Sequence, residues 1–117
     1  MGLSSRLQEV LKTIVNTYPE VADIEDAENL PLPFAVYKIK SFGSKTKDSD
    51  TTGVFAVEIM LVCEEYGEME ETSERIKSAV LSIKDRNTVV VFNDLEGDFD
   101  GEDRAYLSTL NFTIKTF

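Results

Sequence analysis

The feature that most constrains the fold is the run of residues 54–63, in which nearly every side chain is apolar. One alternating register is wholly apolar and contains Phe55, Val57, Ile59, Leu61 and Cys63. The other register contains Val54, Ala56, Met60 and Val62, interrupted only by Glu58. Two apolar registers are typical of a strand buried on both faces. We expect helices to cover the first face. Another subunit, or the long polar loop at residues 43–53, is expected to cover part of the second face, at Val54, Met60 and Val62.

Two amphipathic helices are predicted around this strand. Near the N-terminus an apolar stripe recurs at helical spacing and stops at Pro19, with the members Leu3, Leu7, Val10, Leu11, Ile14 and Val15. A second stripe lies in residues 68–83, with the members Met69, Ile76, Ala79, Val80 and Ile83. Each stripe occupies one face, so each helix is expected to pack on a sheet through that face.

Three further strands are predicted from alternation and β-branched content, at residues 34–42, 88–93 and 105–117. Residues 43–53 and 94–104 are expected to be loops, the second one acidic. The resulting order is α-β-β-α-β-β. It predicts an α+β fold with a mainly antiparallel four-stranded sheet and two helices on one face, in a single domain over residues 1–117.

The composition argues against catalysis. The chain has no His and one Cys, which removes the commonest acid–base group and the commonest zinc ligand. Cys63 lies in the wholly apolar register without a His to activate it, so we expect a buried structural thiol. No catalytic, cofactor-binding or metal-binding residue is expected, and no cofactor.

The acidic segment 94–104 has some features of a metal site. Glu96, Asp98, Asp100, Gly101 and Glu102 resemble the start of a calcium loop, but Leu107 stands where the closing bidentate Glu belongs. A solvated hairpin tip that discourages edge pairing is the preferred interpretation, with no specific role assigned to the segment.

The charge of the chain indicates which classes of partner are expected. The net charge of -10 opposes binding to phosphate backbones, so specific nucleic-acid binding is not expected. The one basic segment contains Lys38, Lys40, Lys45 and Lys47. It is either a solvated strand face and loop or a contact patch for an acidic protein surface. No signal peptide or membrane span is evident, which predicts a cytoplasmic protein with no membrane partner.

Four segments together resemble the tail-terminator and head–tail joining proteins of long-tailed phages. They are the leucine–proline–aromatic start of a strand at 32–37 (LPFAVY), the apolar strand 54–63, the amphipathic helix 71–81 and the last strand at 106–114 (YLSTLNFTI). The resemblance implies a structural subunit of a phage or prophage ring that terminates the tail tube or joins the tail to the head. It also implies a homo-oligomeric ring, contacts with tail-tube or connector proteins, assembly into a virion, and DNA passing through the ring.

Two other classes of function remain open from the residues alone. One is a small regulatory or ligand-binding α+β domain, which would need a concave apolar pocket with a few convergent polar groups. The other is an enzyme with a carboxylate-bound metal, which would need several carboxylates to converge in space.

Overall fold

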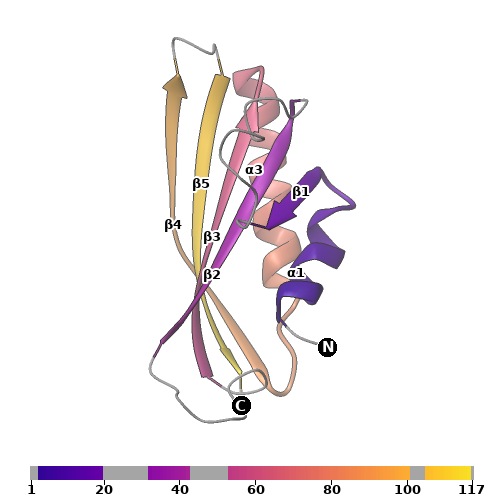
Figure 1. Ribbon diagram of the computed structural model, residues 1–117, viewed down its shortest axis with the longest axis vertical. Coiled ribbons are helices and arrows are strands. Elements are labelled where there is room, and N and C mark those ends of the chain that lie inside the picture. Colours follow the sequence, from indigo (N-terminus) through magenta and orange to yellow (C-terminus); the bar gives the residue numbers. More distant parts are fainter. Residues whose placement is uncertain (1–2, 20–31, 43–52, 101–104, 117) are drawn as a thin grey trace.

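One twisted sheet with two helices makes up the computed structural model, which describes residues 3–19, 32–42, 53–100 and 105–116 (Figure 1). Its elements, in chain order, are α1 (Leu3–Leu11), β1 (Asn16–Pro19), β2 (Phe34–Phe42), β3 (Gly53–Cys63), α3 (Tyr66–Leu81), β4 (Thr88–Asp100) and β5 (Ala105–Thr116). The expected apolar strand and second helix are thus confirmed to within two residues at each end.

The sheet has five strands in the order β1-β2-β3-β5-β4. β3 lies at its centre and pairs antiparallel with β2 and with β5, while β4 pairs antiparallel with β5. The short β1 pairs parallel with β2. The α+β class with two helices is therefore confirmed, but the predicted four-stranded sheet and the order α-β-β-α-β-β are wrong, because a fifth, parallel strand follows α1.

The first helix ends earlier than its apolar stripe indicated. After Leu11 the chain forms a tight turn, in which the Ile14 amide donates to the Leu11 carbonyl over 2.9 Å. The Thr13 hydroxyl also donates to the Val10 carbonyl over 2.9 Å. Residues Asn16–Pro19 then form β1. Val15 is buried nonetheless, because the turn carries its side chain back to the core. The helical spacing therefore continued past the true end of the helix.

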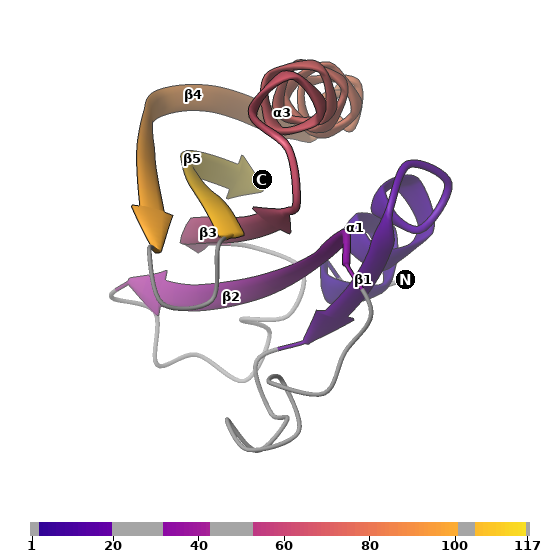
Figure 2. The same ribbon diagram turned by 90° about the horizontal axis from the view of Figure 1, so that it is seen from above.

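Both helices pack on the same face of the sheet, as expected (Figure 2). The core between them and the sheet contains the wholly apolar register of β3, three leucines of α1 (Leu3, Leu7 and Leu11), and Met69, Ile76 and Val80 of α3. β5 adds Leu110, Phe112 and Ile114. Arg6 of α1 also donates to the carbonyl of Ile83 over 2.6 Å, which ties α1 to the chain just after α3.

The acidic segment expected to be a loop is a strand as far as Asp100. A bulge changes its register between Phe92 and Asp94, so that Asn93 and Asp94 both face away from the helices. Their side chains hydrogen-bond Thr113 and Asn111 of β5 on that outer face, over 2.8 and 2.7 Å. A bulge inserts one unpaired residue and so reverses which register faces the core.

The outer face of the sheet holds a second, smaller apolar cluster. Its buried members are Phe34, Val62 and Ala105, with Tyr18, Val36 and Leu107 packed against them. Along the rest of that face the exposed side chains are mainly polar or charged, including Lys38, Lys40 and Glu58. Exposed apolar side chains on this face are Met60 of β3 and, toward the other end of the sheet, Val89 and Val91 of β4.

Candidate functional site: a groove beside an open sheet edge

A groove of about 760 Å³ lies between α3, the last part of β4 and the first part of β5. Before the bulge, Phe92 faces α3 and forms an edge-to-face contact with Phe112 at 5.4 Å between centroids. After the bulge, Leu95 and Phe99 take the helix-facing register, because they pair with Leu110 and Tyr106 of β5. α3 leaves both side chains largely uncovered, and Phe99 is 50% exposed.

Three aromatic rings line one end of the groove. The ring of Tyr106 lies 4.7 Å from that of Phe99 and 5.7 Å from that of Tyr66, measured between centroids. Tyr66 is 53% exposed and Leu95 is 42% exposed. Contiguous exposed aromatic side chains of this kind mark an interaction surface more often than scattered single ones do.

The floor and the rim of the groove differ in polarity. In the floor, the Ser73 hydroxyl donates to the Ser108 hydroxyl over 2.9 Å, and both residues are buried. At the rim stand the carboxylates of Glu70 and Glu74 of α3. A hydrogen bond to Glu70, and its negative charge, raise the pKa of the Tyr66 phenol. The groove therefore suits an apolar side chain that carries or adjoins a positive charge.

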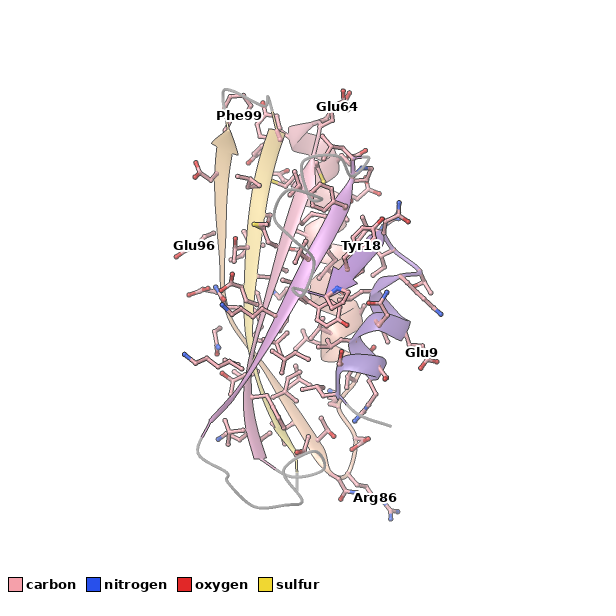
Figure 3. All side chains as sticks on the ribbon, viewed as in Figure 1. Glu9, Tyr18, Glu64, Arg86, Glu96 and Phe99 are labelled. Carbon is pink, nitrogen blue, oxygen red and sulfur yellow. The ribbon has the colours of Figure 1, made fainter. Side chains whose placement is uncertain are left out.

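The strand β4 next to the groove is acidic on its outer face. Asp94, Glu96 and Asp98 alternate there and are all exposed. Figure 3 shows Glu96 projecting from β4 on the side away from the rest of the sheet. After the bulge, the carboxylates and the exposed apolar side chains of Leu95 and Phe99 thus occupy opposite faces of β4, whereas before the bulge Val89 and Val91 are exposed on the outer face.

Two of the four lysines of the predicted basic segment lie in the described part of the chain. Lys38 and Lys40 are exposed on the outer face of β2, where Lys38 pairs in register with Glu58 of β3. Lys45 and Lys47 lie outside the described residues. The structure therefore brings two of the four lysines together on one strand, two residues apart.

The three residues expected at a subunit contact differ in exposure. Met60 is 36% exposed and Val54 is half-buried, both on the outer face of β3. Val62 is only 7% exposed, because it belongs to the outer apolar cluster with Phe34 and Ala105. Within the single chain, Met60 therefore offers the most surface to a neighbour.

The residues considered for chemistry are dispersed or buried. Cys63 is fully buried, and burial, followed by the charge and hydrogen bond of Glu68, raises the pKa of its thiol to about 12. Glu96 and Asp98 lie on an edge strand, while Gly101 and Glu102 lie outside the described residues. Among the described residues, no group of three or more His, Cys, Asp or Glu side chains is placed to hold a metal ion.

In the part of the chain that the structure describes, no helix combines the length and the apolar character that crossing a bilayer requires.

The groove was missed at the level of sequence, although a signal for it was present. In residues 94–99 the apolar Leu95 and Phe99 alternate with Asp94, Glu96 and Asp98. Such alternation predicts a half-buried strand, but the glycine and the acids favoured a loop.

Comparison with known proteins yields a structural likeness only. No protein-family model matches the sequence, and no curated protein matches it. Among solved structures, a chain of the virion of native gene transfer agent (GTA) particle has a similar fold, with a TM-score of 0.66 and 12% sequence identity. The match covers 98% of this chain and 94% of that chain. The two chains therefore share one fold over nearly their whole length.

Proposed function

We propose that the chain is a structural subunit of a phage or prophage ring that terminates the tail tube or joins the tail to the head, without catalysis. The observation that carries the proposal is the end-to-end fold match to a chain of a gene transfer agent virion, a phage-like particle. The resemblance of four sequence segments to phage tail-terminator and head–tail joining proteins supports it independently.

The chemistry of the described residues supports a role in assembly. The most prominent surface feature is an edge strand with exposed apolar side chains, which suits contact between proteins. The one thiol is buried and has a raised pKa, which makes it a poor nucleophile. The net charge of -10 suits a ring through which DNA moves without adhering to the wall.

The proposal is tested by deleting the gene from a host that carries the prophage and examining the induced particles by electron microscopy. The expected result is heads without joined tails, or tails without a closed end, with normal particles restored when the chain is supplied from a plasmid. Normal joined particles from the deletion strain would refute the proposal.

A second candidate, a ligand-binding domain, is favoured by one observation, the groove beside α3. Its volume of about 760 Å³ lies within the ~300–1,000 Å³ typical of small-molecule sites. Calorimetric or thermal-shift screening with small aromatic cations tests this candidate, with Phe99→Ala as the matched variant. Binding that Phe99→Ala abolishes would support it, and the absence of any binding would count against it.

A further inference from the structure

The sheet has two open edges in the described part of the chain. β4 pairs with β5 on one side, and no described strand lies on its other side. β1 pairs with β2 only through Phe34–Tyr37 of β2. Beyond Tyr37, the backbone of β2 therefore has no described neighbour on that side either. Each open edge presents backbone donors and acceptors that a further strand can pair with.

The two edges carry opposite charges on the same face of the sheet. Asp94, Glu96 and Asp98 mark the outer face of β4, and Lys38 and Lys40 mark the outer face of β2. Register connects them directly, because Lys38 pairs with Glu58, Glu58 with Asn111, and Asn111 with Asp94. Lys38 and Asp94 therefore lie at the same height on the two sides of one sheet, whereas Glu96 and Asp98 lie level with Val36 and Phe34. A slip of two residues along the strands sets Lys38 opposite Glu96 and Lys40 opposite Asp94.

The apolar side chains match in the same way on the other face. Leu95 and Phe99 are exposed on the helix-facing side of β4, next to the groove. Ile39 lies between the two lysines in sequence, and its side chain packs on the helix-facing side of β2. If β2 of a second copy lay along β4, Ile39 would approach the apolar edge of the groove while the lysines approached the acids.

Strand direction and like-charge repulsion select how two copies pair. β4 and β2 run in opposite directions within a subunit, because three antiparallel pairings separate them. Two copies in the same orientation therefore place β4 of one antiparallel to β2 of the next. Pairing of β4 with a second β4 would set acids opposite acids, which is destabilising. Pairing of β4 with β2 sets acids opposite lysines and uses two different surfaces of one chain. Such a heterologous contact produces a ring when the rotation closes.

We propose that copies of this chain associate head to tail by antiparallel pairing of β4, through Asp94, Glu96 and Asp98, with β2 of the next copy, through Lys38 and Lys40. The inference deepens the proposed function and rests on it, since it names the partner of the ring subunit and the strands that join. Lys38 already has an interaction within its own chain, so Lys40 is expected to contribute more of the new charge contact.

Cysteine cross-linking between purified full-length variants tests the pairing. Two antiparallel registers set both lysines opposite acids of the proposed contact: one pairs Lys38 with Glu96, and the other pairs Lys40 with Glu96. Glu96→Cys is therefore mixed with Lys38→Cys in one experiment and with Lys40→Cys in another. Directly paired residues of antiparallel strands have Cα atoms about 4.5–5.5 Å apart, which a disulfide spans. We expect a covalent dimer in one of the mixtures and no covalent dimer from any of the variants alone. The native Cys63 is buried and does not compete.

Lys115→Cys is the matched control, because Lys115 is exposed on β5, a strand with neighbours on both sides. Its mixture with Glu96→Cys is expected to give no dimer. A dimer with Lys115→Cys equal to that with Lys40→Cys would overturn the inference, since it would report random collision.

The same experiment in assembled particles separates this inference from the proposed function. The double variant Lys40→Cys, Glu96→Cys, or Lys38→Cys, Glu96→Cys, replaces the chain in the prophage, and the particles are oxidised. A ladder of covalent oligomers supports the pairing. Joined particles without any ladder would refute the pairing and leave the proposed function standing, whereas normal particles from the deletion strain would refute the function itself.

Discussion

Alanine at Ser73 is expected to weaken the attachment of α3 to β5 beneath the groove. The Ser73 hydroxyl donates to the Ser108 hydroxyl over 2.9 Å, and Ser108 is fully buried. In Ser73→Ala the Ser108 hydroxyl loses this partner, and leaving a buried polar group unsatisfied costs about 1–3 kcal/mol. Alanine in place of serine in the helix returns a few tenths of a kcal/mol, about 0.5 at most. The expected net loss in the free energy of unfolding is about 0.5–2.5 kcal/mol.

Ser108→Ala is expected to cost less than Ser73→Ala, because the two hydroxyls have different alternatives. Ser73 lies in α3, where a serine hydroxyl can turn back to the carbonyl one turn earlier. Ser108 lies in β5 and has no such local acceptor or donor within a regular strand. The double variant removes both polar groups together, and that change is nearly neutral for buried pairs. The two single costs should therefore not add.

Urea unfolding followed by far-ultraviolet circular dichroism measures the four proteins of this cycle. The double variant is expected to be more stable than the sum of the single changes predicts, by about 1–2 kcal/mol, within the ~0.5–3 kcal/mol seen for contacting residues. The slope of the free energy against urea should be the same in all four. Additive single changes, to within about 0.5 kcal/mol, would show that the two hydroxyls do not interact.

Three further outcomes are expected. Leu110→Ala should lower the free energy of unfolding in urea by ~2–5 kcal/mol, because Leu110 is fully buried. Its cross-strand partner Leu95 is 42% exposed, so Leu95→Ala should cost well under half as much. Because burial raises the pKa of the Cys63 thiol from 9.0 to about 12, stability should fall as the pH rises from 9 toward 12. Native protein at pH 8 should resist alkylation of this thiol, and rapid native labelling would contradict the burial. Val62→Lys should unfold the single chain, since Val62 is buried, whereas Met60→Lys should leave circular dichroism unchanged and lower any oligomer mass in light scattering.

The parts of the fold that the sequence predicts well are those with one unbroken period. In β3 the register of Ile59 alternates without interruption from one end to the other, and the strand ends where the alternation ends. In α3 the apolar residues recur at helical spacing from Met69 to Val80, and Met69, Ile76 and Val80 of that stripe pack in the core. Long, strongly periodic segments leave few competing structures.

The first helix shows why the same reasoning fails at a boundary. Val15 continues the stripe of α1, and its burial is correct, but it reaches the core through a turn and not through another helical turn. Periodicity reports which residues are buried and does not report the backbone between them. The parallel strand Asn16–Pro19 was missed for this reason, since four residues are too few to show a period of their own.

The prediction for β4 was wrong for a different reason, because the alternation of its apolar residues changes phase within the strand. Val90 and Phe92 face the helices before the bulge, and Leu95 and Phe99 face them after it. Each half alternates correctly, but a single alternating register cannot describe both. An unpaired residue such as Asn93 is evident only from the partner strand, which sequence spacing alone does not supply.

That one residue decides how the open edge can be used. Without the shift at Asn93, the carboxylates of Glu96 and Asp98 would face the groove, and Phe99 would face the outer surface. With it, the part of the edge after the bulge has an acidic outer face and an apolar inner face, each with a counterpart on β2. A small ligand in the groove would use the inner face only, whereas a second copy of the chain would use both. Charge reversal at Glu96, which lies on the outer face, therefore distinguishes the two functions: it should impair assembly and leave the binding of a small ligand in the groove intact.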